Sequence, residues 1–537
     1  MPSSLSQSKL WRFASQFPHL TIALFVALQT GFSLNNRALW FSDEVRYANA
    51  YQNLVEGGHW VVLNLNGLPY PDKPPLFFWL LRIIDAIPTI DGIAVFYIGS
   101  AISGFAFIAA TRLLAKILGL SKEVQTASIF VMLSGLLIIG TFQYLRMDLL
   151  FSAFILLSIA ALYEHYISQT RRTALLGFFY AGIGTLVKGP LALAFPLLTI
   201  VVFLAWTSRF RRFLTLHTLL GLLAFVAPVL AWFGGVILVQ GQAFLSETVL
   251  GTQIMERATN AFHHKEPVRY YFMILPLAFL PWTGFIAALP FNSLRPALIK
   301  TRKSAGPVAF LTLGALSMFV LLSSLSGKVA IYVMPILPLL ALLLANGLFT
   351  GPKRAARGWI GVALLLVSIA VALLFTLSTF TSMLPQIGMT IGSLALLIGA
   401  LASWRYRHGP AHTLLPIMAL TASIWVIAIS VTVLPTFDHK SSPRDHAVAM
   451  RSYAEAGYAP MSFKTYPGIF TYYLGQNLFE TDNIATLTQK IETSERVVLV
   501  MLRDDWAENL ALETQFEIVF EQNIAGGGGD YIVAIKD

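Results

Sequence analysis

Residues 213–239 read FLTLHTLLGLLAFVAPVLAWFGGVILV, without a single Asp, Glu, Lys or Arg. An apolar run of this length can cross the hydrocarbon core of a bilayer as a helix. Arg209, Arg211 and Arg212 precede it, as is typical of the cytoplasmic end of a membrane helix. Similar runs recur along most of the chain, and they predict a polytopic, α-helical membrane protein.

The composition agrees with this prediction. Of 537 residues, 56% are hydrophobic and only 12% are charged, about half the charged share of a soluble domain. A soluble globular enzyme, a disordered chain and a nucleic-acid-binding protein are therefore excluded. The chain has no cysteine, which also excludes disulfides, iron–sulfur clusters and a thiol nucleophile.

Periodicity and length predict thirteen transmembrane helices, and the first of them is expected to be a retained helix rather than a signal peptide. The predicted helices span residues 18–35, 93–117, 123–142, 147–166, 173–188, 190–207, 213–239, 271–290, 305–325, 329–349, 357–379, 386–404 and 412–434. The apolar run 74–84 is too short to span a bilayer, and it indicates an interfacial or re-entrant helix.

The charge distribution predicts how the chain is oriented. Its net charge of +10 divides into +17 for residues 1–435 and −7 for residues 436–537. With a cytoplasmic N-terminus, every predicted inner loop is basic, as the positive-inside rule requires. These loops carry Arg112, Lys116, Lys122, Arg171, Arg172, Arg209, Arg211, Arg212, Arg295, Lys300, Arg302, Lys303, Lys353, Arg354, Arg357, Arg405 and Arg407. An odd number of helices then places the C-terminus outside.

Two domains are predicted. Residues 1–435 form a transmembrane domain with large outer loops at 36–92 and 240–270, and residues 436–537 form a small, soluble α/β domain, called the tail below. In the tail, strand-like runs at 461–466, 497–501, 516–521 and 531–535 alternate with helical runs at 484–492 and 504–513. The glycines at 526–529 follow no strand-to-helix phosphate motif, so no nucleotide site is expected there.

Ionisable residues gather on the predicted outer face of the membrane. Because a charge at membrane depth is costly, each of them is a candidate functional residue. Several Lys and Arg side chains at the lipid interface can bind a phosphate, and carboxylates beside them can act as a base or hold a metal. The set comprises Asp43, Glu44, Arg46, Asp72, Lys73, Arg146, Asp148, Lys188, Arg257, His264, Glu266, Lys328 and Tyr332.

Each of these residues alone also fits a structural role. Asp43 and Glu44 suit the first turn of a helix over 43–57, where acidic side chains are favoured. Lys73 can snorkel to the interface, and Lys188 and Lys328 can anchor helix ends. The shared placement of the whole set on one face favours the functional interpretation, namely chemistry on a lipid-linked phosphate.

Several short motifs occur in a fixed order along the chain. The first outer loop reads DEVRYA at 43–48, GHWVV at 58–62 and NGLPYPDKPPL at 66–76. Further along are RMD at 146–148, LVKGP at 186–190, HKEP at 264–267 followed by YY at 270–271, and Lys328 with Tyr332 and Pro335. This pattern resembles the bacterial aminoarabinose transferases of lipid A and their relatives, the protein mannosyltransferase-like enzymes of the GT-C class.

The resemblance implies an inverting glycosyltransferase with a GT-C fold of about thirteen helices and an outer C-terminal α/β domain. Its donor would be a sugar linked through phosphate to a polyprenol such as undecaprenol. Transfer would occur on the outer face of the bacterial inner membrane, without a nucleotide cofactor, to lipid A, another envelope glycan or a protein. His59 stands where the aminoarabinose enzymes often have Asp, so the resemblance leaves the sugar and acceptor open.

The resemblance also implies roles for individual residues. Asp43, Glu44 and Asp148 would form the catalytic acidic set, with Asp43 activating or orienting the acceptor. The ligands of the lipid phosphate would be Arg46, Lys73, Arg146, Lys188, Arg257, Lys328 and Tyr332. Asp72 and His264 resemble a pair that binds a divalent metal such as zinc or magnesium, although the closest relatives have Glu in place of the aspartate.

A transporter of lipids or lipid-linked sugars is the alternative function. It would also need a phosphate site in the membrane, but its charged residues should follow a path to both faces. The concentration of charged candidates on one face favours the transferase. The sequence assigns no oligomeric state.

Overall fold

The computed structural model describes residues 8–32, 36–90, 92–256, 266–288, 306–350, 352–509 and 515–537. The chain forms two compact units. The first, called the helical unit, comprises Met1–Ser33, Asp72–Phe77 and Tyr97–Ser430. The second, called the loop–tail unit, comprises Leu34–Pro71, Phe78–Phe96 and Val431–Asp537. Most of the first outer loop therefore belongs to the same unit as the tail.

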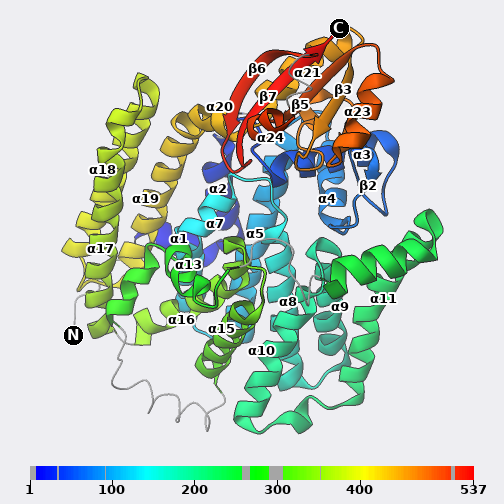
Figure 1. The fold of residues 1–537 in the computed structure, drawn as a ribbon. Coiled ribbons are helices and arrows are strands. Elements are labelled where there is room, and N and C mark those ends of the chain that lie inside the picture. The colour runs from blue at the N-terminus through cyan, green and yellow to red at the C-terminus, as the bar shows by residue number, and fades with distance from the viewer. Residues whose placement is uncertain are drawn as a thin grey trace. The chain divides into compact units, whose positions relative to one another are not determined.

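Helices follow one another through the helical unit (Figure 1). They are α1 (Lys9–Gln16), α2 (Pro18–Gly31), α5 (Ala94–Ile117), α6 (Lys122–Met132), α7 (Leu136–Thr141), α8 (Asp148–Ser168), α9 (Arg171–Lys188), α10 (Leu191–Thr207), η1 (Phe210–Arg212), α11 (Leu216–Gln240), η2 (Phe244–Glu256), α13 (Tyr270–Ala278), η3 (Trp282–Ala288), α15 (Pro307–Ser324), η5 (Ala330–Ile336), α16 (Leu337–Thr350), α17 (Pro352–Phe375), η6 (Leu377–Thr379), α18 (Met383–Arg405) and α19 (Ala411–Thr432). Among these, α8 packs on α9 and α10, α9 on α11, and α17 on α18.

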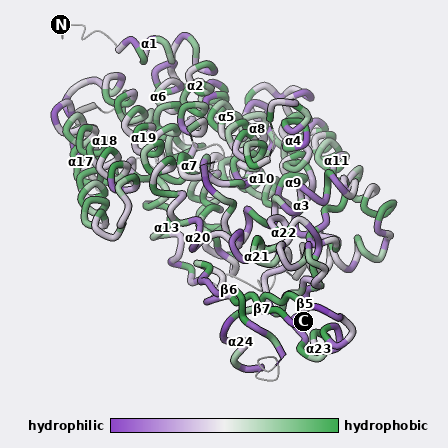
Figure 2. The backbone as a smooth tube through the Cα atoms, turned by 90° about the horizontal axis from the view of Figure 1, so that it is seen from above, coloured by the Kyte–Doolittle hydropathy of each residue, from purple (hydrophilic) through white to green (hydrophobic). Residues whose placement is uncertain are grey.

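The predicted class of a polytopic helical membrane protein is confirmed. Within the described residues, eight helices are long and apolar enough to cross a membrane. They cover Ala94–Ile117, Asp148–Ser168, Leu216–Gln240, Pro307–Ser324, Ala330–Thr350, Ala355–Thr379, Met383–Arg405 and Ala411–Thr432. Apolar residues run along α17, α18 and α19 (Figure 2). Each of the thirteen predicted segments contains helical structure, and the full count of thirteen spans remains a prediction.

The predicted helix over 123–142 is interrupted in the structure, where α6 ends at Met132 and α7 begins at Leu136. The interruption frees backbone groups that a continuous helix would have paired. The side-chain amide of Gln29 donates to the Leu133 carbonyl at 2.9 Å, and the indole of Trp282 donates to the Val131 carbonyl at 3.0 Å. The break is therefore stabilised by side chains from distant parts of the sequence.

Proline accounts for a second interruption. The predicted helix over 271–290 divides into α13 and η3, and Pro281 lies between them. Proline lacks the N–H that a continuing helix needs, and its ring crowds the preceding turn. The second predicted outer loop also gains structure, because η2 is a π-helix within it. Residues 257–265 lie outside the described part of the chain.

The loop–tail unit contains α3 (Asp43–Gly57), the hairpin β1 (Asn64–Leu65) and β2 (Leu68–Pro69), and α4 (Leu76–Asp85), which begins within the helical unit. The tail adds η7 (Leu434–Phe437), α20 (Asp438–Ser441), α21 (Arg444–Glu455), β3 (Ala459–Phe463), α22 (Thr471–Leu474), β4 (Phe479–Thr481), α23 (Ile484–Glu492), β5 (Val497–Leu502), α24 (Arg503–Glu508), β6 (Glu517–Ile524) and β7 (Gly529–Lys536). All four predicted strands and both predicted helices are present, and α21, α22 and β4 are additions that the sequence did not indicate.

The tail is built around one mixed, five-stranded sheet in the order β4-β3-β5-β7-β6 (Figure 1). The strands β4, β3 and β5 are parallel, whereas β7 is antiparallel to both β5 and β6. Met461, Phe463 and Leu499 pack against Leu487 and Ile491 of α23 in its apolar core. The predicted α/β domain at the C-terminus is thus confirmed as a mixed-sheet fold.

His446 is fully buried on α21 within the tail. Its Nε2 lies 3.1 Å from the carbonyl oxygen of Gln522 and 3.2 Å from that of Tyr531. Two acceptors at one nitrogen mean that Nε2 carries the proton and donates. The Phe520 ring packs edge-on against the imidazole. Burial lowers the pKa of His446, because the charged imidazolium is poorly solvated there.

Acidification should loosen the tail. A histidine with a lowered pKa in the folded state contributes stability that is fully present above its unfolded pKa of about 6.5, and that stability is lost as the pH falls from there through the lower pKa of the folded state. We expect the β6 and β7 amides to exchange faster at about pH 5.5 than at about pH 7.5, after correction for intrinsic rates. The measurement is hydrogen exchange on the full chain.

The variant His446→Gln should remove most of this pH dependence. His439→Gln is the matched control, because the side chain of His439 is 71% exposed. A pH dependence that disappears with His439→Gln and persists with His446→Gln would contradict the assignment.

Candidate functional site

The first turn of α3 carries three of the predicted site residues, Asp43, Glu44 and Arg46. Two carboxylates begin the helix, where unpaired backbone N–H groups favour negative charge. The helix ends at Gly58, whose φ of 69° lies in the left-handed region that glycine tolerates best. The predicted helix over 43–57 is confirmed, and it places Asp43 and Arg46 half-buried near the helix start.

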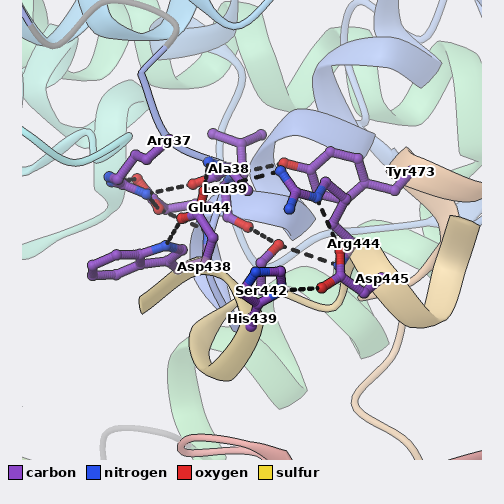
Figure 3. A network of polar contacts seen from close by, with 11 residues as sticks. Arg37, Ala38, Leu39, Glu44, Asp438, His439, Ser442, Arg444, Asp445 and Tyr473 are labelled. Atoms are coloured by element: carbon purple, nitrogen blue, oxygen red, sulfur yellow. Dashed lines mark hydrogen bonds and ion pairs between the residues drawn. The ribbon is translucent and has the colours of Figure 1, made fainter. Parts of the chain in front are cut away.

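Glu44 is buried, and it pairs with an arginine that precedes α3 (Figure 3). The Arg37 guanidinium donates from Nη1 to Glu44 Oε2 at 2.8 Å and from Nη2 to Oε1 at 2.9 Å. The backbone N–H of Trp40 donates to the same carboxylate at 2.9 Å, and the Arg37 guanidinium lies over the Trp40 ring. Glu44 therefore shapes the loop before α3, while its catalytic role remains a prediction.

Arg46 is fixed by groups from the first loop and the tail, all within the loop–tail unit. Its Nε donates to the carbonyl of Pro467 at 3.1 Å. Its guanidinium carbon lies 5.3 Å from the Tyr70 ring centroid and 5.4 Å from that of Tyr466. A cation held between two aromatic faces is pre-oriented for an anion. This geometry suits the predicted role of Arg46 in phosphate binding.

Glu480 is a charged residue near this arginine that the sequence did not single out. The Gly468 N–H donates to its carboxylate at 3.0 and 3.2 Å. Burial raises the pKa of Glu480, and the Gly468 N–H, Asn66 and the charge of Arg46 oppose that shift. No local motif marks Glu480, because two of its neighbours, Asn66 and Arg46, come from the first outer loop, several hundred residues earlier.

The Asn66-Gly67 motif turns the β1–β2 hairpin. Both residues have positive φ, 52° and 75°, as a tight two-residue turn requires. The Asn66 side chain also joins the loop to the tail, because its Nδ2 donates to the Leu478 carbonyl at 2.8 Å and its Oδ1 accepts from the Leu478 N–H at 2.9 Å. The N-G part of the family-like pattern thus has a structural explanation.

The helical unit brings four other predicted residues together. Asp148 begins α8 and is 3% exposed. Its carboxylate accepts a hydrogen bond from Arg146 Nε at 3.1 Å and another from Lys188, the last residue of α9. The Lys188 ammonium also lies 4.9 Å from the centroid of the Tyr332 ring on η5. We call Arg146, Asp148, Lys188 and Tyr332 the helix-end cluster.

The helix-end cluster joins two cations to one carboxylate, and all three charged side chains are at least four-fifths buried. Guanidinium and ammonium groups are the side chains that bind phosphate oxygens in proteins. In such a buried position, their attraction for a phosphate would be weakly screened by water.

Lys328 has a different environment from Lys188. It is 3% exposed, and its ammonium donates to the backbone carbonyls of Glu266 and Leu325. These bonds tie the start of η5 to the segment before α13. The geometry supports the structural interpretation of Lys328, whose predicted phosphate contact stays a prediction.

The remaining predicted residues lie in less defined surroundings. Asp72 and Lys73 are half-buried in the turn before α4. Arg257 and His264 lie outside the described residues. Across the described residues, no group of three or more His, Asp or Glu side chains is placed to hold a metal. The predicted metal pair of Asp72 and His264 stays a prediction, because His264 lies outside the described residues, and no chemical step is assigned to a metal.

Neutral substitutions on the first turn of α3 should separate Glu44 from Asp43. Glu44→Gln leaves the buried Arg37 without its counterion, which should lower stability by about 3–5 kcal/mol. Asp43→Asn changes a half-buried residue and should cost much less. Thermal unfolding of both purified variants in the same detergent measures the difference, and equal melting temperatures would contradict the structural role of Glu44.

Comparisons with known proteins agree with this architecture. Residues 72–232 match the family of dolichyl-phosphate-mannose-protein mannosyltransferases. The chain is 29% identical over 419 residues to the undecaprenyl phosphate-alpha-4-amino-4-deoxy-L-arabinose arabinosyl transferase of Pseudomonas aeruginosa, covering 75% of this chain and 72% of that protein. It is also 29% identical over 345 residues to the transferase of the same name from Erwinia tasmaniensis, covering 63% and 60% respectively.

A solved structure shares the fold over nearly the whole chain. The crystal structure of ArnT from Cupriavidus metallidurans bound to undecaprenyl phosphate superimposes with a TM-score of 0.75 at 19% identity, covering 97% of this chain and 98% of that one. The apo structure of the same protein gives a TM-score of 0.73. The expected resemblance is confirmed: the chain is a multi-pass membrane protein that is similar to the aminoarabinose transferases, and its residues 72–232 match the mannosyltransferase family.

Proposed function

We propose that this chain transfers an aminoarabinose-type sugar from undecaprenyl phosphate to lipid A. The observation that carries the proposal is the content of the mannosyltransferase-family segment. Residues 72–232 contain Lys73 together with Arg146, Asp148 and Lys188 of the helix-end cluster. The Pseudomonas aeruginosa relative named for this donor and sugar aligns with three quarters of the chain.

The proposed reaction exchanges one bond at the anomeric carbon of the sugar. The bond from that carbon to the undecaprenyl phosphate oxygen breaks, and a bond to an acceptor oxygen forms on the opposite face. Undecaprenyl phosphate leaves with the electron pair of the broken bond. Fixed cations stabilise this developing charge, which is the role proposed for Arg46, Lys73, Arg146 and Lys188.

Asp43 is proposed to act on the acceptor. If the acceptor atom belongs to a hydroxyl group, the carboxylate takes up its proton as the new bond forms. If the acceptor is a lipid A phosphate, which is already ionised, Asp43 orients it instead. Both versions need an aspartate that reaches the substrate, and its half-buried position at the start of α3 is compatible with that requirement.

The proposed orientation places the N-terminus in the cytoplasm and the C-terminus on the outer side of the inner membrane. The support is the basic character of every predicted inner loop. The candidate site residues then share the outer side. A lipid-linked sugar can meet lipid A there without a nucleotide donor.

Asp43→Asn should abolish transfer, because amide oxygen is a poor base and lacks the negative charge. The measurement is mass spectrometry of lipid A from cells that carry the wild-type chain, the variant or neither. A sugar-sized mass increase on lipid A should appear only with the wild-type chain. Glu56→Gln, an exposed carboxylate in the last turn of the same helix, is the control and should retain the increase.

Mass spectrometry of the same samples also tests other acceptors. An Asp43-dependent mass on another envelope glycan or a protein would keep the transferase and replace lipid A as the acceptor. Full transfer by Asp43→Asn would contradict the proposed role of this residue. No mass change in any fraction would favour the transporter.

Lys73→Ala should weaken donor binding. Removing one charged hydrogen bond to a phosphate costs roughly 1.5–3 kcal/mol, which corresponds to about a tenfold to hundredfold rise in the donor dissociation constant. Titration of the purified protein with undecaprenyl phosphate measures the change. Lys116→Ala, at the exposed end of α5, is the control. Equal affinities of the two variants would reassign Lys73 to an interfacial anchor.

A further inference from the structure

We infer that Asp438, in the tail, is a positioning residue that holds the loop before α3 and so places Asp43 for the reaction. The inference deepens the proposed function and rests on the role of Asp43 there. Asp438 belongs to none of the family-like motifs, and it lies some four hundred residues after Asp43 in the sequence.

The Asp438 carboxylate is buried and binds two donors from the loop (Figure 3). Its Oδ2 accepts from the Ala38 backbone N–H at 2.8 Å, and its Oδ1 accepts from the Trp40 indole Nε1 at 2.7 Å. Hydrogen bonds to an ionised acceptor are stronger than neutral ones, by roughly a factor of two. Asp438 therefore fixes both the backbone and the tryptophan side chain of this loop.

Neighbouring tail residues bind the rest of the same loop backbone. The Leu39 N–H donates to the Tyr473 hydroxyl oxygen at 2.6 Å, and the Leu39 carbonyl accepts from Ser442 Oγ at 2.7 Å. The Phe41 N–H donates to the Ser441 carbonyl at 2.7 Å. Residues 38–40 have no regular secondary structure, so the tail supplies the partners that a strand or helix would otherwise provide.

The constraint continues from the loop to the first turn of α3. Trp40, held by Asp438, donates its backbone N–H to Glu44. Arg37 completes the connection by binding the same Glu44 carboxylate from the other end of the loop. Since Glu44 follows Asp43 directly, a displacement of Trp40 changes the position of the helix start that carries Asp43.

Arg46 depends less on Asp438, although it lies on the same helix. Its contacts are with the Pro467 carbonyl and the rings of Tyr70 and Tyr466. Loss of Asp438 should therefore disturb the placement of Asp43 more than the cation that is proposed to bind the donor. This difference predicts an effect on turnover with little effect on donor binding.

The test compares Asp438→Asn with Asp445→Asn. Asparagine retains the size of Asp438 but presents an amide N–H₂ group to one of two N–H donors, so one contact is lost. Asp445 is the matched control, because its carboxylate pairs with His439 and Arg444 of the tail rather than with the loop. Tyr473→Phe and Trp40→Phe each remove one polar group that joins the loop to the tail. These variants replace Asp438→Asn in the test if that variant folds poorly.

The first readout is independent of activity. Hydrogen exchange on the full chain should show faster exchange at residues 38–46 in Asp438→Asn than in Asp445→Asn, at matched melting temperature. Unchanged exchange there would overturn the inference, whatever the chain catalyses.

The second readout is kinetics per folded molecule, with undecaprenyl phosphate-linked aminoarabinose and lipid A as substrates. We expect kcat of Asp438→Asn to fall by about tenfold to a hundredfold, the scale of a small misplacement of a reacting group, with the donor KM within about twofold of wild type. A purely structural role predicts fewer folded molecules with normal kcat, and that result would also overturn the inference. Inactive wild-type protein with the expected exchange difference would instead contradict the proposed function.

Discussion

The requirement that every polar group removed from water find a partner governs this molecule. A buried charge without a counterion costs several kcal/mol, and in a bilayer the backbone itself must be paired. Asp148 is paired with two cations, and Glu44 is paired with Arg37. Where the helix breaks between α6 and α7, Gln29 and Trp282 donate hydrogen bonds to the freed carbonyls.

This requirement connects the fold with the site. The residues proposed to act on phosphate are cations that already have fixed neighbours, such as Arg46 between two aromatic rings and Lys188 beside Asp148. Side chains held in this way need little reorganisation when a negative charge develops. The pairing that stabilises the protein without substrate thus also prepares it for an anionic leaving group.

The sequence predicted what depends on local pattern. Apolar runs marked the membrane helices, and the amphipathic run at 484–492 coincides with α23 because its own side chains decide its burial. The sequence also identified four candidate site residues that the structure brings together in the helical unit, namely Arg146, Asp148, Lys188 and Tyr332. Charged residues at helix ends can be recognised from the local sequence. They are informative because placing a charge in a membrane costs free energy.

What the sequence missed depends on contacts between distant segments. At the break after α6, the freed carbonyls accept hydrogen bonds from Gln29 and Trp282. No sequence pattern near residue 133 predicts either partner. The pairing of Glu44 with Arg37 was not predicted, because an arginine seven residues before a glutamate has many alternative partners. The same holds for Glu480 and Asp438, because each has neighbours that come from the first outer loop.

The reciprocal hydrogen bonds between Asn66 and Leu478 have a consequence for how such proteins can recombine. A chimaera that exchanges only residues 436–537 between homologues would pair one parent's loop with the other parent's sheet. The first outer loop and the tail pack together in one unit, although most of the chain separates them in the sequence. Natural exchange of the C-terminal tail is therefore constrained by residues of the first outer loop, and the two segments must diverge together.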